Sequence, residues 1–222
     1  MINAIVFDMD GVLCRYRIER RLDRLASWSG QRPDAIHAAI WRSGFEDEAE
    51  RGLMSANDYL RGFGERMGYP LSAAQWVEAR RAAIEPDLAV LSLARQLGTH
   101  LPVGMFTNNP LLLKRHLAEV FPAVPDIFAT RAVFSAELGR SKPDPEAFRR
   151  LAARLGLAPG RSCISTTMRP MSRAPGRPGS SPIQSARRQT CAPASRLTGS
   201  IAGRVISRAE NGSSPRRSRR CH

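Results

Sequence analysis

The stretch Ile5–Leu13, which reads IVFDMDGVL, decides the fold of this chain. An apolar run ends in two carboxylates, Asp8 and Asp10, and Gly11 follows directly. If a strand ends at Asp8, the two side chains can converge at its carboxyl end, where open α/β sheets bind their ligands. Neighbouring carboxylates repel each other, and a divalent cation relieves that repulsion. Taken alone, so short a pattern fits a strand followed by an acidic turn equally well.

Two later segments carry groups that complement these carboxylates. Residues 103–107, VGMFT, read as an apolar strand that ends in Thr107. Residues 141–148, SKPDPEAF, place Lys142 before the start of a helix. Each segment also has a simpler interpretation: Thr107 could merely end a strand, and Lys142 could be a solvated surface charge. The Asn108–Pro110 segment could likewise form a turn with an N-cap for the next helix.

Taken together and in this order, the three segments resemble the first three motifs of the haloacid dehalogenase-like (HAD) hydrolases. The family pattern is hhhDxDGxL, then a strand ending in Thr or Ser, then a Lys that often precedes Pro. The resemblance implies that Asp8 is a nucleophile that forms an aspartyl-phosphate, and that Asp10 is the general acid and base. It implies that Thr107, Asn108 and Lys142 bind the phosphoryl group of a small phosphate ester, and that the Lys142 charge assists catalysis. It also implies that Asp8 and Asp10 bind Mg²⁺, Asp8 together with the phosphate and Asp10 commonly through its backbone carbonyl.

The coarse pattern of the chain predicts a matching fold. Apolar runs bounded by turn signals alternate with amphipathic segments, and this alternation is typical of an α/β protein with a doubly wound parallel sheet. The predicted strands are residues 2–7 and 102–107, with weaker candidates at 127–129 and 132–134. The predicted helices are residues 88–97, 111–120 and 146–155.

A long, almost wholly helical insert separates the first two motifs. Ser55 precedes Asp58 by three residues and Ser72 precedes Gln75 by three, and both pairs resemble capping boxes at helix starts. The resemblance implies that this insert is the helical cap of the first cap class, which closes over the site and selects the substrate. The predicted division is a core of residues 1–14 and 84–164, a cap of residues 15–83, and a tail of residues 165–222.

The tail differs sharply in composition from the rest of the chain. Residues 1–164 hold 22 Lys and Arg against 19 acids, whereas residues 165–222 hold 12 Arg against one acid, Glu210. Such a basic segment, rich in Ser, Pro and Gly, buries too little apolar area to offset its ordering entropy. We therefore predict a disordered tail. If the tail is genuine, it could bind nucleic acid or anionic surfaces, although its Arg residues lack interleaved aromatics.

The tail begins where the family's fourth motif should place a pair of metal-binding acids after an apolar strand. This chain instead has the residues STTM at positions 165–168, and no acid occurs between Glu146 and Glu210. Codons for these residues, read one base earlier, can encode an apolar residue, Asp, Asp and Asn. We therefore predict a reading-frame shift near residues 163–165, of natural origin or from a sequencing error, and a core that is incomplete at its C-terminus. Weak Mg²⁺ binding and poor turnover of phosphate esters should follow.

Three function classes remain open. A Mg²⁺-dependent phosphatase is favoured, while a 2-haloacid dehalogenase or a phosphomutase is the alternative within the family. Dehalogenases usually lack a carboxylate at the second position, so Asp10 argues against that activity. The third class is a non-catalytic remnant with a basic, nucleic-acid-binding tail. The N-terminal residues do not resemble a signal peptide and no apolar run is long enough to span a membrane, so we predict a cytoplasmic protein.

Overall fold

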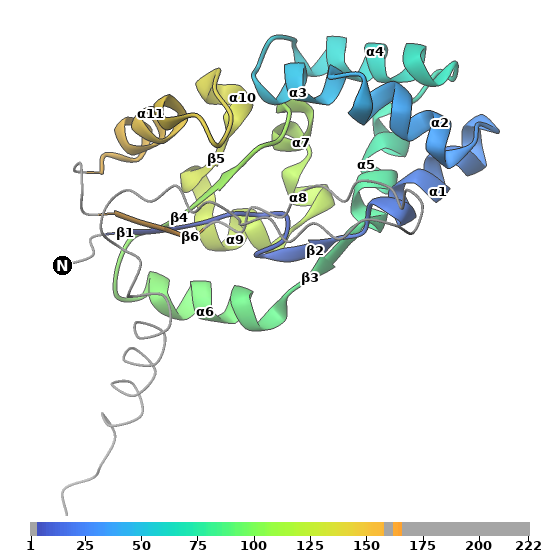
Figure 1. The fold of residues 1–222 in the computed structure, drawn as a ribbon. Helices are drawn as coiled ribbons and strands as arrows, with labels where there is room; N and C mark the ends of the chain where they lie inside the picture. The colour runs from blue at the N-terminus through green and yellow to red at the C-terminus, as the bar shows by residue number, and fades with distance from the viewer. Residues whose placement is uncertain (1–3, 158–161, 166–222) are drawn as a thin grey trace, which may run out of the picture. The chain divides into compact units, whose positions relative to one another are not determined.

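A computed structural model describes residues 4–157 and 162–165 of the chain. Its centre is a parallel sheet with the strand order β5-β4-β1-β6 (Figure 1). The strands are β1 (Ala4–Phe7), β4 (Val103–Thr107), β5 (Ala132–Phe134) and β6 (Ser162–Ser165). The chain moves outward from β1 through β4 to β5 and then returns to the other side of β1. The strand order therefore reverses beside β1, and Asp8 follows β1 at this switch point, the usual ligand site of such sheets.

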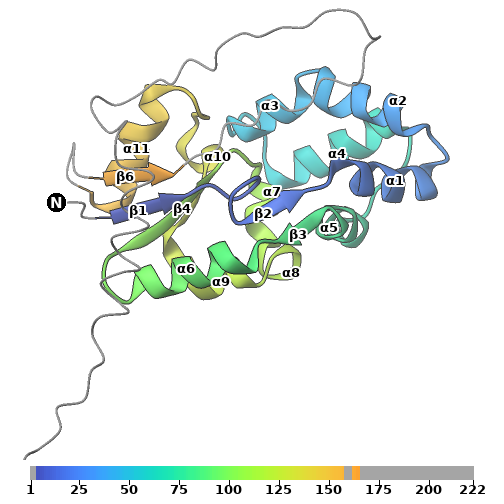
Figure 2. The same ribbon diagram turned by 60° about the horizontal axis from the view of Figure 1, so that its bottom comes forward.

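One face of the sheet is covered by two helices, α10 (Ser135–Leu138) and α11 (Pro145–Leu155) (Figure 2). Val6, Phe106 and Val133, one from each of three adjacent strands, point to this face and pack with apolar side chains of the two helices. All three are at most 1% exposed. Because alternate strand residues share a face, their neighbours must point to the opposite side of the sheet.

The opposite face is covered by α6 (Leu88–Gly98) and α9 (Ala123–Phe128) (Figure 2). Phe7 and Met105 belong to the larger buried cluster on this side, and the Phe7 ring lies 5.9 Å from the ring of Phe128. Strands buried on both faces need apolar residues at successive positions, which explains the continuous apolar runs in the sequence. The predicted doubly wound parallel sheet is confirmed.

Residues 17–83, which precede α6 in the chain, are largely helical and lie beyond the carboxyl ends of the strands (Figure 1). Two short antiparallel strands, β2 (Cys14–Tyr16) and β3 (Ile84–Pro86), form the double connection between this insert and the sheet. Sequence analysis did not predict this ladder. The helices of the insert are α1 (Ile18–Ser29), α2 (Pro33–His37), the π-helix η1 (Ala38–Arg42), α3 (Phe45–Glu50), α4 (Ala56–Met67) and α5 (Ala73–Ala82).

Two helices of the insert begin at the predicted capping residues. The Ser55 hydroxyl accepts a hydrogen bond from the Asp58 main-chain nitrogen at 3.1 Å, directly before α4. Ser72 and Gln75 form a reciprocal capping box before α5, with distances of 3.2 and 3.0 Å. All three bonds satisfy main-chain nitrogens that have no partner within the helix, and so they fix where each helix begins.

Two sequence predictions in the second half of the core are wrong. Residues 127–129, predicted as a strand, form the end of α9 and the start of a 3₁₀ turn, η2 (Ala129–Arg131). Val124 and Phe128 lie four residues apart and both reach the buried cluster, a helical spacing that the short apolar run conceals. Residues 111–120 form two helices, α7 (Leu111–Arg115) and α8 (Leu117–Val120), because the backbone of His116 leaves the helical region with φ −108° and ψ 21°.

The remaining predictions concern the tail and the membrane. Of the tail predicted to be disordered and out of frame, residues 165–222, Ser165 is instead the last residue of β6, and residues 166–222 lie outside the described residues. The apolar strand that precedes the predicted frame shift is present as β6 and pairs with β1 along its length. Within residues 4–157 and 162–165, no helix combines the length and apolar character needed to cross a bilayer.

Candidate active site

Asp8 and Lys142 form an ion pair at the carboxyl end of β1. Lys142 Nζ lies 2.7 Å from Asp8 Oδ1, and both side chains are mostly buried. The same ammonium group donates to the main-chain oxygen of Phe106 at 3.0 Å, and the Met9 nitrogen donates to Asp8 Oδ1 at 2.8 Å. Burial raises the pKa of Asp8, and although Lys142 opposes this effect, the pKa remains above its ordinary value. The two residues predicted as nucleophile and catalytic cation therefore meet in a largely desolvated position.

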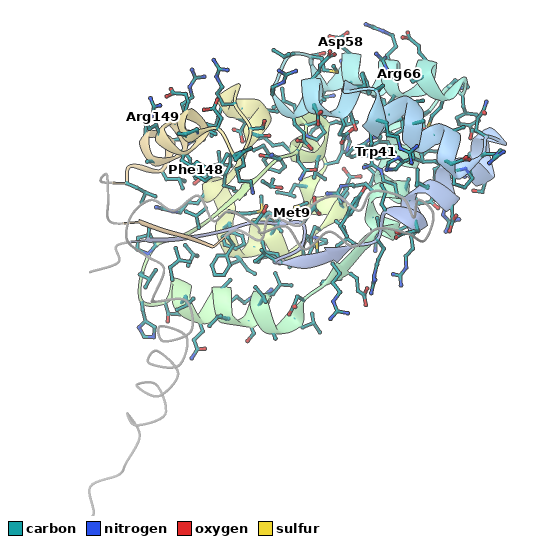
Figure 3. The ribbon with its side chains drawn as sticks, viewed as in Figure 1. Met9, Trp41, Asp58, Arg66, Phe148 and Arg149 are labelled. Carbon is teal, nitrogen blue, oxygen red and sulfur yellow. The ribbon has the colours of Figure 1, made fainter. Side chains whose placement is uncertain are left out.

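Met9 anchors the turn that carries both aspartates. Its side chain is fully buried within the large apolar cluster, and Figure 3 shows it at the end of β1. The main-chain oxygen of Met9 accepts hydrogen bonds from the nitrogens of Leu13 and Cys14 at 2.9 and 3.2 Å, which close the turn. The buried methionine between two acids thus fixes the direction in which Asp8 and Asp10 leave the strand.

The Asn108 side chain holds the loop that carries Lys142. Its amide group donates to the Lys142 main-chain oxygen and accepts from the Lys142 main-chain nitrogen, both at 2.9 Å. Sequence analysis assigned Asn108 to phosphate binding. In the structure its side chain is hydrogen-bonded to the main chain of the lysine.

Asp10 lies in a second hydrogen-bond network, beside Thr107. Asn109 Nδ2 donates to Asp10 Oδ2 at 3.1 Å and to the Thr107 hydroxyl at 2.6 Å. Thr107 and Asn109 are both buried. The alternative interpretation of this segment as an N-cap is not what the structure shows, because Pro110 occupies the N-cap position of α7 and no side chain caps the helix there. Sequence analysis missed Asn109, although its adjacency to the strand-ending Thr107 was a usable signal.

Arg80, on α5 of the insert, binds the same carboxylate. Arg80 Nη2 lies 2.7 Å from Asp10 Oδ2, and the arginine side chain is 2% exposed. The guanidinium carbon lies 4.2 Å from the centroid of the Tyr16 ring, a distance typical of a cation–π contact. Nothing local marked this residue in the sequence, since Arg80 and Arg81 read as an ordinary basic helix end and the partner lies 70 positions away.

The end of α3 approaches the site from the insert. The Ser135 hydroxyl donates to the Glu50 main-chain oxygen at 2.6 Å and accepts from the Asn109 nitrogen at 3.2 Å, and it thus joins insert and core. Burial, reinforced by the nearby acids Glu46, Asp47 and Asp10, raises the pKa of Glu50 to about 9. Glu50 is therefore a neutral carboxyl group near Asp10 at neutral pH, and sequence analysis did not single it out.

These geometries agree with a comparison against known families. The family model of the haloacid dehalogenase-like hydrolases matches residues 2–164. The chain belongs to this family. The HAD-like chain is therefore a hydrolase, and the match ends at the last residue before the change in composition.

Individual relatives of this HAD-like hydrolase fall into two groups. Phosphatase MT3486 of Mycobacterium tuberculosis is 27% identical over 173 residues, which cover 71% of this chain and 75% of the relative. Among solved structures, the HAD family enzyme bt-2542 of Bacteroides thetaiotaomicron is similar with a TM-score of 0.61 at 22% identity, covering 73% and 83% of the two chains. The L-2-haloacid dehalogenase of Xanthobacter autotrophicus is similar with a TM-score of 0.50 at 21% identity, covering 74% and 69%. The structural likenesses show a shared fold.

The HAD-like site offers oxygen ligands that suit Mg²⁺, but the phosphate of the substrate has to supply some of the ligands. Among residues 4–157 and 162–165, no three His, Cys, Asp or Glu side chains gather as a ready metal site. Mg²⁺ is commonly bound by one or two carboxylates together with substrate phosphate oxygens, and it retains several waters. The Asp8 carboxylate and the Asp10 main-chain carbonyl are hard oxygen donors of the type that Mg²⁺ prefers, and both follow directly on β1. The ligand types at this site therefore suit Mg²⁺, but the described part of the protein supplies few of them.

Proposed function

We propose that this hydrolase cleaves a small phosphate ester through an aspartyl-phosphate on Asp8, with Mg²⁺ as its cofactor. The observation that carries the proposal is the 2.7 Å ion pair of Asp8 and Lys142 at the carboxyl end of β1. Two relatives support it: one is a phosphatase, and the bt-2542 enzyme was solved in complex with magnesium and inorganic phosphate. Sheet topology places this end of β1 where α/β folds bind ligands.

In the first chemical step the Asp8 carboxylate attacks phosphorus and the bond from phosphorus to the ester oxygen breaks. Lys142 and the Met9 nitrogen both hold Asp8 Oδ1, so the carboxylate is oriented before substrate arrives. The Lys142 ammonium also offsets negative charge on the phosphoryl group as it transfers, in a site from which water is largely excluded. The Thr107 hydroxyl, beside Asn109, would donate a hydrogen bond to a phosphoryl oxygen.

Asp10 serves the two proton transfers. As an acid it protonates the departing ester oxygen, and as a base it then takes a proton from the water that hydrolyses the aspartyl-phosphate. Water attacks phosphorus, the bond to Asp8 breaks, and inorganic phosphate leaves. Asp8 and Asp10 would hold Mg²⁺, which would neutralise part of the phosphate charge.

The helical insert, residues 15–83, is proposed to be the cap that covers this chemistry. Its contacts with the core already surround the site, through Arg80 on Asp10 and through the Glu50 main chain on Ser135. A covered site excludes water and strengthens the interactions of charged groups inside it. The side chains of the insert that face the site would then select the substrate.

A reading-frame shift is proposed to explain the missing fourth motif. In the ladder between β6 and β1, Ser165 pairs with Phe7, the residue before Asp8. The acids that the neighbouring frame can encode at positions 166 and 167 thus follow directly on the strand beside Asp8. The nucleotide sequence of codons 160–185 tests this proposal, because codons that cannot encode Asp-Asp in the neighbouring frame contradict it.

The phosphatase proposal is tested with p-nitrophenyl phosphate and a panel of sugar phosphates, with Mg²⁺ and with a chelator. Slow, Mg²⁺-dependent release of phosphate is expected, and Asp8→Asn should reduce it to background while the exposed control Asp34→Asn retains it. Release that survives Asp8→Asn contradicts the assignment of the nucleophile. Chloride release from 2-chloropropionate, with no phosphate release, would support dehalogenation in its place.

A further inference from the structure

The two oxygens of Asp10 have unlike surroundings. Oδ2 accepts hydrogen bonds from Arg80 Nη2 at 2.7 Å and from Asn109 Nδ2 at 3.1 Å. Oδ1 lies 3.6 Å from the Cys14 thiol, which is a weak donor. A cation and an amide therefore fix one oxygen, and the other is held only weakly. The Asp10 side chain is 28% exposed, so a substrate can approach it.

Arg80 is itself held rigidly from three sides. Its guanidinium group lies over the Tyr16 ring, and Nη2 also donates to Asn109 Oδ1 at 3.3 Å. The Tyr16 hydroxyl in turn accepts a hydrogen bond from Arg21 Nη1 at 3.0 Å. Burial lowers the pKa of Arg80, but the combined attraction of Asp10 and the other acidic groups around it outweighs burial and leaves the pKa above its ordinary value, so the group is a permanent cation. A rigid, charged donor of this kind sets the orientation of the carboxylate that it binds.

The Arg80 contact joins the insert to the core at one chemical group. Arg80 and Tyr16 stand on α5 and β2, whereas Asn109 follows β4 of the sheet. If the ion pair only stabilised the fold, Arg80 would not need to bind Asp10, the proposed general acid. Because donors from both parts of the chain meet on Oδ2, the orientation of Asp10 depends on the insert lying as it does here.

We propose that Arg80 is the positioning residue of the general acid Asp10, an inference that rests on the proposed phosphatase function. Oδ2 stays bonded to Arg80 and Asn109, so each proton transfer runs through Oδ1. The proton passes from Oδ1 to the ester oxygen as the bond from that oxygen to phosphorus breaks. In the second step Oδ1 takes a proton from the attacking water, which returns Asp10 to its starting state. Arg80 makes this geometry available only when the insert covers the site.

The leaving group distinguishes this role from a structural one. p-Nitrophenolate leaves without protonation, whereas the alkoxide of glycerol phosphate needs the acid. Arg80→Met should therefore lower kcat/KM for glycerol phosphate at least about tenfold more than for p-nitrophenyl phosphate, since general acid catalysis contributes a factor of about 100 or more. Arg80→Lys, which keeps the charge but not the planar donor pair, should fall between. Added guanidinium should restore part of the lost selectivity to Arg80→Ala.

Two control variants separate positioning from stability and from net charge. Arg81→Met removes an exposed charge next to Arg80, and Leu25→Ala opens a cavity at a fully buried position of α1 in the insert. Both should leave the ratio of the two kcat/KM values unchanged. If Arg80→Met lowers both values by the same factor, as Leu25→Ala would, the positioning role is overturned.

Thermal unfolding tests the pairing of Arg80 with Asp10 without relying on enzyme activity. Asp10→Asn, Arg80→Met and the double variant form a cycle in which the double variant should lose less Tm than the sum of the single losses. Additive losses would overturn the pairing itself. A wild-type chain that hydrolyses neither ester overturns the proposed function, and the catalytic role of Arg80 with it. Hydrolysis of both esters with unchanged selectivity in Arg80→Met overturns only the present inference.

Discussion

Lys142 bridges Asp8 to the neighbouring strand, because its Nζ lies 2.7 Å from Asp8 Oδ1 and donates to the main-chain oxygen of Phe106 at 3.0 Å. The lysine thereby fixes the proposed nucleophile relative to β4, which carries Thr107 at its end. Asn108, the residue after Thr107, holds the lysine main chain in return. The proposed nucleophile Asp8, the Lys142 cation and the end of β4 are thus joined by direct contacts.

Lys142→Met should raise the pKa of Asp8 further above its ordinary value. Burial already raises this pKa, and the lysine is the principal group that opposes the effect. Since Asp8 attacks as a carboxylate, the acidic limb of the pH profile of kcat/KM should move to higher pH. The carbon-13 shift of the Asp8 carboxyl, followed against pH, measures the same change without turnover. Lys142→Arg keeps the charge and should shift the titration much less; an unmoved titration in Lys142→Met would contradict the role of the lysine.

Glu50→Gln should stabilise the protein at neutral and alkaline pH. The pKa of Glu50 is raised from 4.5 to about 9, so between these values the folded state retains a proton that the unfolded chain releases. Stability must therefore fall as pH rises through this window, and it is unaffected below it. At pH 8 the variant should gain at least about 1.4 kcal/mol, the equivalent of one pKa unit.

Urea unfolding at pH 5 and pH 8 measures the effect of Glu50→Gln. The gain should be small at pH 5 and larger at pH 8. Glu48→Gln, an exposed change on the same helix, serves as the control and should show no such dependence on pH. A Glu50→Gln gain that is equal at the two pH values would show that the carboxyl is ionised in the folded protein.

The residues that the sequence revealed are those whose signals are local. Asp8 and Asp10 end one apolar run and Thr107 ends another, and parallel strands bring such ends to one edge of a sheet. Lys142 was visible through the Lys-Pro pair before a helix. In each case a short pattern determines the local structure, and the sheet then assembles the parts.

Arg80 and the 127–129 segment show why other features escaped prediction. Arg80 reaches Asp10 only because the rotation of α5 about its axis and the β2–β3 connection place it there, and neither is encoded near position 80. The apolar run at 127–129 is too short for periodicity to separate strand from helix, and Val124 and Phe128 become recognisable as a helical pair only once both are seen in the buried cluster.

Gly52→Ala should destabilise the contact between the insert and α10. Gly52 has φ +72°, and a Cβ atom there would lie 2.2 Å from the main-chain oxygen of Ala136. Gly44 has φ +84° but nothing within 4 Å of such an atom, so Gly44→Ala introduces backbone strain alone. We expect a loss of about 1–2 kcal/mol for Gly44→Ala and a further loss of about 1–3 kcal/mol for Gly52→Ala. Urea unfolding measures the loss of stability in both variants. Equal losses would show that the main chains at Gly52 and Ala136 can move apart without a cost in free energy.

Acidic residues at positions 166 and 167 should raise the affinity for Mg²⁺. The β6 ladder ends with Ser165 beside Phe7, one residue before Asp8, so the next residues of the chain are the natural source of further carboxylates. Mg²⁺ gains affinity from well-placed carboxylates and keeps its remaining waters. Thr166→Asp combined with Thr167→Asp should therefore lower the Kd for Mg²⁺ by at least about tenfold, equivalent to about 1.4 kcal/mol.

Isothermal titration with Mg²⁺ alone measures this affinity without any need for turnover. Ser180→Asp combined with Ser181→Asp adds the same charge elsewhere in the tail and controls for nonspecific attraction of the cation. Asp8→Asn in the Thr166→Asp, Thr167→Asp background should abolish the gain, because the new carboxylates act on the same ion as Asp8. An equal gain from both acidic pairs would mean that net charge alone attracts the metal, and the missing fourth motif would then not explain weak binding.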